Sequence, residues 1–565
     1  MQLQNKNDNA ANRKSYVGSI YNVGERKVKQ AVLASLNEKW AALHKEGYIH
    51  IHDLDAYGLT YNCLTFDILK AFPYQNFAGL SSVKIILGVF DFLKELFERM
   101  GNEQSGGMAL ANFDNDFATI FTKLNVPLKG NEEVFRAAIR DLIVWCNNTH
   151  TRMGQTSYYV SFNIGLASSE YARFLAFTLI DEFYNAGELI YKPNIIFKVA
   201  QGISRNPQDK NYDLFLKALE CTGKKMIPTY LLCDCEMDKG TAPELLSVMG
   251  CRTRVVADRF GKTGAIGRSN VDNITINLPR LALETLKEMP NAATDSVLAR
   301  VKEKWISVAD TVTEILLDRF YKTCRQDVEL FPTLKQYNLV CENINEVQSL
   351  HELFKHGTLS IGFIGLSEML NLIYRGKYWQ DETIYKAAKD FVAFMRDYTD
   401  RQSDKYNLNF SLLATSGELI SGRFLEIDKK KFKSDIFKKG FYTNSFHVEV
   451  DSTIAAWEKI EKEGQFHSFC NGGCITYVEL HEAPLGNPQG LRELVEIAVK
   501  AGVHYLGFNF PKDVCSECGA SGTFDVCPLC NSKRITHIRR VSGYLEIQDY
   551  FTEGKKRESA TRKAN

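Results

Sequence analysis

The sequence predicts an α/β protein built on a largely parallel sheet or barrel. Short runs rich in β-branched and aromatic residues alternate with long amphipathic stretches along most of the chain. With 565 residues, the chain is also too long for one small core, so we expect a large barrel or several domains. The strand-like runs are YYVSFNIGL, PNIIFKV, IPTYLLCD, ITINLP, LSIGFIGL, FHVEV, CITYVEL and VHYLGFNF.

The N-terminal part of the chain is expected to be helical after a short tail. Residues 1–15 are polar and predict a flexible tail, and residues 16–47 predict a helix with a glycine cap at Gly47. Residues 48–68 alternate as a strand with its exit loop. Amphipathic helices are expected in VKIILGVFDFLKELFERM and EEVFRAAIRDLIVWCNN.

The chain changes character near its C-terminus. Up to about residue 510 we find no repeat, low-complexity tract or linker, so 16–510 is expected to form one α/β core. Residues 511–565 are rich in cysteine, then basic and poor in helical pattern, and are expected to form a separate C-terminal domain.

Charge and hydropathy exclude two classes of partner. Lys and Arg number 69 against 68 Asp and Glu, a net charge of +1, which offers no general attraction to nucleic acid or an anionic membrane. No apolar run approaches the ~20 residues that span a bilayer. The start, MQLQNKNDNAANRKS, lacks the apolar centre of a signal peptide, so we expect a cytoplasmic protein.

Fourteen cysteines are many for a reducing compartment, where they more often serve metals or chemistry than disulfides. Four of them form the motif CSECGASGTFDVCPLC, in which two C-x-x-C knuckles are separated by eight residues. Four thiolates that meet tetrahedrally are typical of a structural zinc site, and an iron site or a redox dithiol pair is the alternative. We expect most of the other ten to be buried as small hydrophobes. The proposed ligands are Cys515, Cys518, Cys527 and Cys530.

Taken alone, this motif also fits a zinc ribbon that binds nucleic acid, and the nearby basic residues support that interpretation. The sequence that follows, RRVSGYL, discriminates between them. Gly543 in this motif would ordinarily be a turn glycine. However, the whole tail, from GVHYLGFNFP through the cysteines to RVSGYL and EGKKRE, resembles the C-terminus of class III, anaerobic ribonucleotide reductases.

The resemblance implies that Gly543 carries a stable radical. Glycine suits this role because its α-carbon lies between an amide nitrogen and a carbonyl that share the unpaired electron, and no side chain hinders planarity. The zinc module would then hold the radical loop. Ser542 is a departure, since many relatives are expected to have cysteine there.

The resemblance extends over essentially the whole chain. Cys251, in LLSVMGCRTRVV, would ordinarily be a buried and inert cysteine. In the family this turn is a finger loop inside the barrel, which implies that Cys251 becomes a thiyl radical and abstracts the 3′-hydrogen of the ribose. Cys63, in TYNCLTFD, matches the second active-site cysteine, which delivers a hydrogen atom from the opposite face.

The motif GRSNVDNITINLPR resembles the stretch that carries an active-site asparagine. Aligning its ends assigns that role to Asn270, although Asn273 lies close by. An asparagine that bonds its own backbone in a loop is the ordinary alternative. In the branch of the family that has this asparagine and both cysteines, formate is the reductant, so formate is expected here.

Two further motifs are candidates for binding substrate. HIHD would ordinarily suggest a metal pair or a structural histidine pair, and its resemblance is to a substrate-contacting strand. ATSGELISGRF has a capping box, Thr415 with Glu418, and small residues that leave backbone N–H groups open to a polyphosphate, although a plain helix cap explains it equally well. No P-loop or Rossmann fingerprint is present. The proposed substrate-binding residues are His50, His52, Asp53, Thr253, Thr415, Ser416 and Gly417, with Ser416 and Gly417 replacing the Pro-Ala of relatives.

Many relatives carry an ATP-binding cone before the catalytic core. The core pattern here begins by residue 16, so we expect a form of the enzyme without this cone and without overall activity control through it. Substrate-specificity control by dNTP or ATP, which uses helices at a dimer interface, is compatible with residues 81–116, so a homodimer is expected. No effector residue can be assigned, and Cys233 and Cys235 have no explanation.

The resemblance thus implies the ten-stranded α/β barrel of glycyl radical enzymes with a C-terminal zinc-bearing radical domain. The expected activity is reduction of ribonucleoside triphosphates to deoxyribonucleoside triphosphates. The chain has no C-x-x-x-C-x-x-C cluster, so a separate radical S-adenosylmethionine iron–sulfur activating enzyme is implied.

Two rivals are disfavoured by the same residues. A pyruvate formate-lyase-like acyltransferase often has paired finger cysteines, whereas Gly250 and Arg252 flank Cys251, and such enzymes lack the four-cysteine module. A zinc-ribbon nucleic-acid-binding protein is disfavoured by the balanced charge and by the long α/β core.

Overall fold

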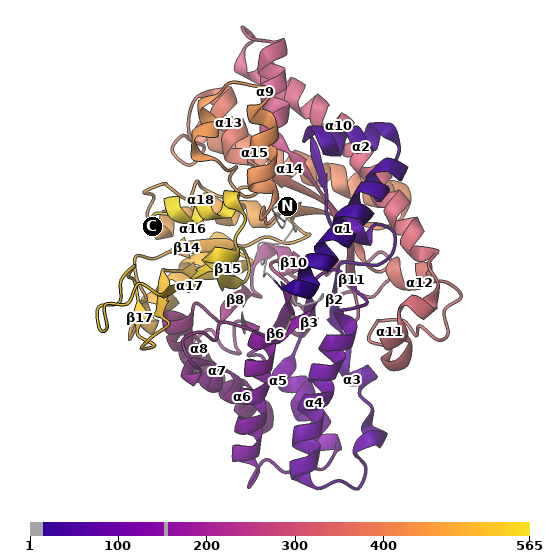
Figure 1. Ribbon diagram of the computed structural model, residues 1–565, viewed down its shortest axis with the longest axis vertical. Coiled ribbons are helices and arrows are strands. Elements are labelled where there is room, and N and C mark those ends of the chain that lie inside the picture. Colours follow the sequence, from indigo (N-terminus) through magenta and orange to yellow (C-terminus); the bar gives the residue numbers. More distant parts are fainter. Residues whose placement is uncertain (1–14, 152–155) are drawn as a thin grey trace.

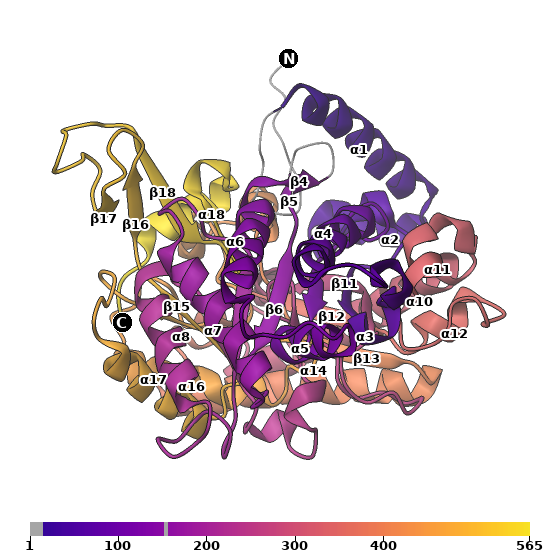
Figure 2. The same cartoon turned by 90° about the horizontal axis from the view of Figure 1, so that it is seen from below.

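The computed structural model describes residues 15–151 and 156–565, so the tail expected at 1–15 lies outside the described residues except for Ser15. One large sheet forms the centre of the molecule, with helices around it (Figures 1 and 2). Its continuous path runs β13-β12-β11-β2-β3-β6-β7-β8-β15-β14, and β1 (Ile49–Ile51) pairs beside it with β11. The ten strands of the path are β2 (Cys63–Phe66), β3 (Met108–Leu110), β6 (Val160–Ile164), β7 (Asn194–Val199), β8 (Thr229–Leu232), β11 (Ser269–Asn277), β12 (Thr358–Ile364), β13 (Asn409–Ala414), β14 (Thr476–Glu479) and β15 (Tyr505–Asn509).

The sheet consists of two parallel halves that run in opposite directions. β2, β3, β6, β7 and β8 form one half, and β11 to β15 form the other. The halves meet in antiparallel pairs, β2 with β11 and β8 with β15. Between β13 and β14 a parallel bridge pairs Leu413 with Gly473, and the Ala414 amide donates to the Gly473 carbonyl at 3.0 Å. The predicted ten-stranded barrel is therefore confirmed.

Amphipathic helices cover the outside of the barrel. Two of the predicted helices are present with nearly the expected bounds, α4 (Ser82–Met100) and α6 (Glu132–Asn148), and each buries its apolar stripe. In Figure 2 these and other helices surround the central strands. The others include α5 (Phe113–Lys123), α7 (Glu170–Asn185), α8 (Tyr212–Lys225), α9 (Leu278–Glu288), α10 (Thr294–Cys324), α13 (Leu366–Tyr374), α14 (Glu382–Tyr406), α16 (Ala456–His467) and α17 (Pro488–Ala501). None of the helices among the described residues is long and apolar enough to cross a membrane.

The single helix predicted over residues 16–47 is two helices. α1 (Tyr16–Ser35) ends before Leu36, and α2 (Glu38–Glu46) begins after Asn37. The Asn37 side chain accepts a hydrogen bond from the Lys39 amide at 2.9 Å, so it caps α2 instead of continuing the first helix. The predicted cap at Gly47 is confirmed, with φ of +86°.

The strand predicted at FHVEV is wrong. Residues 446–450 are an irregular buried segment, and the Val448 amide donates to the Glu463 carboxylate of α16 at 3.0 Å instead of to a neighbouring strand. Residues 446–449 are all buried, so the alternation of apolar and polar residues does not mark a half-buried strand. Three barrel strands were not predicted: β3, β13 and also β2, which lies where the exit loop was expected.

The C-terminal segment forms a small antiparallel sheet at one side of the barrel, shown at the upper left of Figure 2. Its order is β17 (Ser521–Gly522), β16 (Lys512–Cys515), β18 (Ile535–Arg540) and β19 (Leu545–Ile547). One helix follows, α18 (Glu553–Thr561), and it packs on α15 (Ile420–Lys429). A β-carbon on Gly554 would lie 2.8 Å from the Gly422 backbone, so glycine at both positions allows this close packing.

Candidate active site

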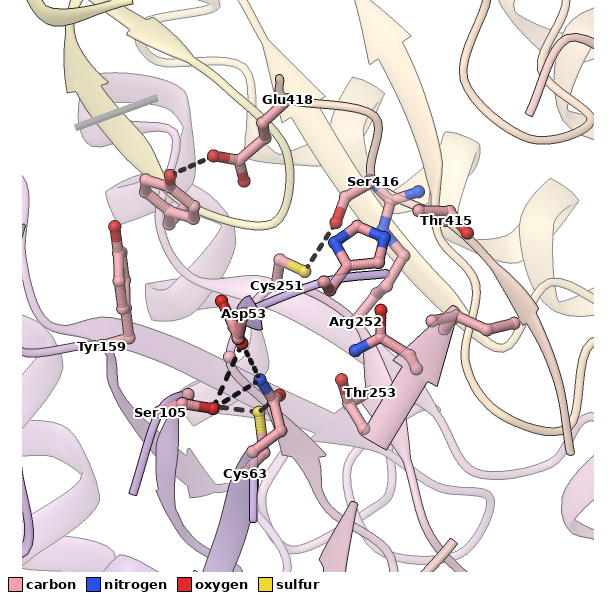
Figure 3. A pocket seen from close by; sticks show the side chains of 18 of the residues that line it. Asp53, Cys63, Ser105, Tyr159, Cys251, Arg252, Thr253, Thr415, Ser416 and Glu418 are labelled. Carbon is pink, nitrogen blue, oxygen red and sulfur yellow. Dashed lines mark hydrogen bonds between the residues drawn. The ribbon is translucent and has the colours of Figure 1, made fainter. Parts of the chain in front are cut away.

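A cavity of about 110 Å³ lies inside the barrel and brings most of the predicted site residues together (Figure 3). Its walls come from the loop before β2, the segment before β3, a hairpin around Cys251, β11, the segment after β13 and the C-terminal Tyr544. The predicted residues that line it are His52, Asp53, Cys63, Cys251, Thr253, Thr415 and Ser416. His50, Asn270, Gly417 and Gly543 are not part of its lining.

Cys251 stands at the tip of a short hairpin between β9 (Val248–Met249) and β10 (Thr253–Arg254). Gly250, with φ of +56°, makes the turn. The fully buried Arg252 fixes the hairpin by donating to the Tyr477 hydroxyl at 3.0 Å and to the Ala414 carbonyl at 3.3 Å. The hairpin thus places Cys251 on the wall of the cavity, at the position expected for a finger loop.

The segment that joins β13 to β14 in the barrel, at Gly472 and Gly473, packs closely against this hairpin. A β-carbon on Gly473 would lie 2.1 Å from the Arg252 carbonyl oxygen, and the Arg254 amide donates to the Gly472 carbonyl at 3.0 Å. Only glycine leaves room for the two backbones to approach so closely.

Gly543 lies at the tip of the turn that joins β18 to β19. The Val541 amide donates to the Tyr544 carbonyl at 3.0 Å and closes this turn. A β-carbon on Gly543 would lie 1.6 Å from the Cys251 carbonyl oxygen and 2.4 Å from the Cys251 α-carbon. The two loop tips are therefore in direct contact, and no residue with a side chain fits at position 543 without displacing one of them.

Polar contacts hold this turn from both sides. Ser542 donates to one carboxylate oxygen of Glu418 at 2.8 Å, and Tyr544 donates to the other at 2.6 Å. Arg540, fully buried at the end of β18, donates to the Gly543 carbonyl at 3.3 Å and to the Asn509 side chain at 2.6 Å.

Cys63 faces the same cavity from the start of β2. Its thiol donates to the Asn62 side-chain oxygen at 2.8 Å, and the Gly107 amide donates to its sulfur at 3.1 Å. Burial raises the pKa of the Cys63 thiol to about 12, so it keeps its hydrogen at neutral pH. Cys251 makes its own contact, with 3.1 Å between its sulfur and the Ser416 hydroxyl. Two thiols, one of which belongs to the loop that touches a buried glycine, thus line one cavity.

The HIHD segment contributes His52 and Asp53. The Asp53 carboxylate accepts from Asn62 at 2.8 Å and from Ser105 at 3.1 Å, and its backbone is left-handed, with φ of +46°. Arg319 of α10 supports this conformation by donating to the His52 carbonyl at 2.7 Å. His50 is buried behind the cavity, where its ring packs edge-on against that of His52 at 4.6 Å.

The sequence pattern described as "Anaerobic ribonucleoside-triphosphate reductase" matches residues 8–564. The chain belongs to the anaerobic ribonucleoside-triphosphate reductase family. The reductase of this description from Haemophilus influenzae is 28% identical over 560 residues, which cover 91% of this chain and 77% of the relative.

Solved structures agree with this membership at the level of the fold. A structure entitled "Anaerobic ribonucleotide reductase" superposes with a TM-score of 0.71 at 15% identity, over 97% of this chain and 88% of that one. The Thermotoga maritima anaerobic ribonucleotide reductase, in complex with dATP and CTP, superposes with a TM-score of 0.67 at 16% identity. The superposition covers 94% of this chain and 89% of that one.

The four C-terminal cysteines of the reductase form a cluster suited to zinc. Their sulfur atoms all lie within 4.8 Å of one another, and the pairs Cys515–Cys530 and Cys518–Cys527 are each 3.5 Å apart. Tetrahedral zinc with Zn–S bonds of about 2.3 Å requires sulfur separations of about 3.8 Å, so the cluster fits a ZnS₄ site. Because β16 leads into Cys515 and also pairs with β18, the cluster braces the strand that leads into the Gly543 turn.

The two candidate asparagines of the reductase occupy different places. Asn270 is the cross-strand partner of Cys63, but its side-chain amide donates to the Thr358 and Ser360 hydroxyls, both at 3.0 Å, and does not line the cavity. Asn273 does line it. A bulge in β11 between Asn270 and Asp272 separates the two positions, a local irregularity that alignment of the motif ends does not reveal.

The capping box predicted at Thr415 and Glu418 is wrong. α15 begins only at Ile420, and the Thr415 hydroxyl bonds to Thr275 at 3.0 Å. The Gly417 amide donates to the Asn444 side chain at 3.0 Å, so it is not open to a phosphate. Glu418 bonds instead to Ser542 and Tyr544 of the Gly543 turn, residues 124 and 126 positions away, which no local pattern could show.

Cys235, unexplained by the sequence, supports the hairpin that carries Cys251. Its sulfur bonds to Asp238 at 3.2 Å, and Asp238 forms a buried ion pair with Arg254 at 2.6 Å and a bond with His504 at 2.6 Å. Burial alone would raise the pKa of Asp238, but His504 and Arg254 hold it well below its usual range. Cys233 is buried nearby, like most cysteines outside the zinc cluster, as predicted.

Proposed function

We propose that the reductase stores its radical on Gly543, passes it to Cys251 and uses the Cys251 thiyl to activate a ribonucleoside triphosphate in the cavity. The observation that carries this proposal is the direct contact between the Gly543 turn and the Cys251 backbone at the cavity wall. Enclosure inside the barrel excludes the water and oxygen that would quench these radicals.

The proposed transfer moves one hydrogen atom. The S–H bond of Cys251 breaks and a C–H bond forms at the Gly543 α-carbon, which leaves the unpaired electron on sulfur. Cys251 then takes the 3′-hydrogen of the ribose, and the 2′-hydroxyl departs as water. Cys63, kept as a neutral thiol by its burial, gives the hydrogen atom of its S–H bond to C2′. Formate replaces that hydrogen atom and supplies one electron as it becomes CO₂, a proton is taken up at the 3′-oxygen, and Cys251 returns its hydrogen atom to C3′.

We assign ribose and phosphate contacts to the polar residues that line the cavity, which are His52, Asp53, Thr253, Thr415 and Ser416. His50 and Gly417 lie behind them and support the segments that carry His52 and Ser416. Asn273 is better placed than Asn270 to meet substrate, because only Asn273 reaches the cavity.

Formate is the proposed reductant, because an asparagine accompanies the two cysteines. The balanced reaction joins the ribonucleotide, formate and a proton to give the deoxyribonucleotide, CO₂ and water. Incubation with ¹⁴C-formate should release one labelled CO₂ for each deoxyribonucleotide formed. Turnover with a thioredoxin-type dithiol in the absence of formate would overturn this assignment.

A zinc ion would be held by Cys515, Cys518, Cys527 and Cys530, and it would supply a structural crosslink and no redox chemistry.

Residues 511–565 are proposed to act as the radical domain and 16–510 as the catalytic core. A radical S-adenosylmethionine iron–sulfur enzyme is the proposed activator. We further propose a cytoplasmic homodimer whose specificity region lies near residues 81–116, with dNTP or ATP effectors; the Thermotoga maritima relative was solved with dATP and CTP.

One experiment tests the core of the proposal. The purified reductase is incubated anaerobically with an activating enzyme, S-adenosylmethionine and a reductant, and its EPR spectrum is recorded before a nucleoside triphosphate and formate are added. We expect a glycyl doublet and deoxyribonucleotide formation. When the protein is produced with α-deuterated glycine, the doublet should collapse to a singlet, because the splitting comes from the α-hydrogen of the glycyl radical. An unchanged doublet would place the radical elsewhere.

A further inference from the structure

Glu418 connects the two partners of the proposed radical transfer, and neither its sequence motif nor the proposed mechanism accounts for this. It lies on the segment between β13 and α15, with its carboxylate turned toward the radical turn, as the dashed line in Figure 3 shows. Building on the roles proposed above for Gly543 and Cys251, we propose that Glu418 is a positioning residue that seats the Gly543 turn against Cys251.

The geometry on the radical side is specific. The two oxygens of one carboxylate accept from Ser542 and Tyr544, the residues on either side of Gly543. Ser542 is 1% exposed and Glu418 5% exposed, so these bonds are shielded from competing water. Because both flanking residues are held by one rigid, planar group, the turn cannot rotate about Gly543 without breaking a charge-assisted hydrogen bond.

The same segment also reaches the thiyl partner. Ser416, two residues before Glu418, places its hydroxyl 3.1 Å from the Cys251 sulfur, and the Glu418 amide donates to the Ser416 carbonyl at 2.9 Å. Segment 416–418 therefore contacts both Cys251 and the residues around Gly543, and it fixes their separation from one side of the barrel.

A third contact connects Glu418 to the start of the last helix of the chain. The Thr552 hydroxyl, at the N-terminal cap position of α18, donates to the Glu418 carbonyl at 2.9 Å. α18 packs on α15, the helix that begins directly after this segment. Glu418 is thus bonded to the C-terminal region at three points, Ser542, Tyr544 and Thr552.

Glu418 also lines the substrate cavity, so a direct contact with the nucleotide is the competing role. The two roles make different predictions for Ser542 and Tyr544, the residues that donate hydrogen bonds to the carboxylate. If Glu418 positions the radical turn, removing either of its hydroxyl donors should reproduce part of the defect of Glu418→Gln. If Glu418 acts on substrate, those donors should matter little.

The test compares Glu418→Gln, Tyr544→Phe and Ser542→Ala in the full-length, zinc-loaded protein. Glutamine keeps the size of Glu418 but loses the charge and one acceptor oxygen. Phenylalanine keeps the packing of ring 544 on Tyr159, whose centroids are 4.9 Å apart, and removes only the hydroxyl. Glu426→Gln is the matched control, because Glu426 lies on α15 and forms a surface contact with Arg557 of α18 at 3.4 Å.

For each variant, the glycyl radical per chain is measured by EPR, and kcat per radical and KM for the nucleotide are measured under anaerobic conditions. We expect similar radical content and KM in all variants. kcat per radical should fall about tenfold or more in Glu418→Gln, which removes the charge that both hydrogen bonds share. It should fall by up to about tenfold in Tyr544→Phe and Ser542→Ala, which each lose one hydrogen bond to a charged group. Glu426→Gln should match the unmodified protein.

A double variant adds a second criterion. Once the carboxylate is gone, its partner hydroxyl has little left to lose, so Glu418→Gln with Tyr544→Phe should be hardly slower than Glu418→Gln alone. Wild-type kcat per radical in both Tyr544→Phe and Ser542→Ala would overturn the inference. This criterion still applies if Glu418→Gln fails to fold, because the two variants leave Glu418 itself unchanged. A raised KM with unchanged kcat in Glu418→Gln would also overturn it and indicate substrate binding.

Failure of the proposed function is seen separately. Turnover by Cys251→Ser, or no glycyl signal in the unmodified protein, would contradict the radical pair itself. Wild-type turnover in the loop variants, with Cys251→Ser inactive, would contradict only the role of Glu418.

Discussion

Gly543 presses directly on the backbone of Cys251, so that a β-carbon at position 543 would lie 1.6 Å from the Cys251 carbonyl oxygen. This contact joins two loops that are distant in the sequence, one from the C-terminal sheet and one from inside the barrel. It explains in steric terms why position 543 requires glycine, independently of the electronic argument for a glycyl radical.

Gly543→Ala should therefore lose both the glycyl EPR signal and all nucleotide reduction. The methyl group forces the two loop tips apart and hinders a planar radical. When the activated protein is exposed to air, O₂ should cleave the unmodified chain at Gly543, with a fragment that begins near Tyr544, and should leave Gly543→Ala intact. Mass spectrometry decides between these outcomes. Gly24→Ala, at a helical glycine with open space around it, is the control and should behave like the unmodified protein.

Cys251→Ser should form the glycyl radical but reduce no nucleotide, because the O–H bond of serine is too strong to exchange a hydrogen atom with carbon. The comparison is between EPR spin content and deoxyribonucleotide formed. Cys341→Ser serves as control, since Cys341 is a half-buried cysteine outside the cavity and should retain activity. Measurable turnover by Cys251→Ser would remove this residue from the mechanism.

Asn273→Ala should impair nucleotide reduction more than Asn270→Ala does. Asn273 faces the cavity, whereas the Asn270 amide bonds to Thr358 and Ser360 and chiefly stabilises the pairing of β11 with β12. Losing these buried bonds should lower the stability of Asn270→Ala by about 1–3 kcal/mol. Thermal unfolding and steady-state kinetics of both variants separate the effects, and a larger kinetic defect in Asn270→Ala would restore that residue as the active-site asparagine.

The barrel could be predicted because its signals are local, since periodic runs marked most strands and helices. Cys63, Cys251 and Gly543 were assigned through motifs that resemble those of the family, and the structure brings both cysteines to one cavity and Gly543 against Cys251. β3 escaped prediction because it has only three residues, Met108–Leu110, after two glycines. The sequence FHVEV at 446–450 imitated a strand because apolar and polar residues alternate in it, yet residues 446–449 are all buried and the Val448 amide donates to the Glu463 side chain.

The missed parts of the site depend on contacts between distant residues. Glu418 looked like half of a capping box because Thr415 stands three residues before it, yet its partners are Ser542 and Tyr544. Asn62 and Ser105 meet Asp53 only because β2 and β3 are neighbours in the barrel. Such contacts follow from the folded arrangement and leave no spacing pattern in the sequence.

The zinc cluster should be required for radical installation but not for folding of the barrel. Purified protein should contain about one zinc per chain, and Cys527→Ala should lose it, because three thiolates cannot complete the tetrahedral site. The hairpin that leads into β18 would then loosen, while the barrel core stays folded. Metal analysis, circular dichroism and EPR after activation test this, with Cys233→Ala as a buried control that keeps its zinc. Zinc near zero in carefully purified protein would contradict the assignment.

The thiol of Cys63 should resist alkylation until strongly alkaline pH. Burial raises its pKa from 9.0 to about 12, so less than about one part in a thousand of Cys63 is thiolate at pH 8. The thiolate is the nucleophile, so alkylation should be correspondingly slow. Its alkylation rate should therefore climb about tenfold per pH unit from pH 7 to pH 10 without levelling off. In denaturant the pKa returns toward its ordinary value and the rate should level off near pH 9. Peptide-level mass spectrometry after brief treatment with iodoacetamide measures both curves. A folded-state plateau near pH 9 would mean that Cys63 ionises freely, and a neutral hydrogen donor could not then be maintained at this position by burial alone.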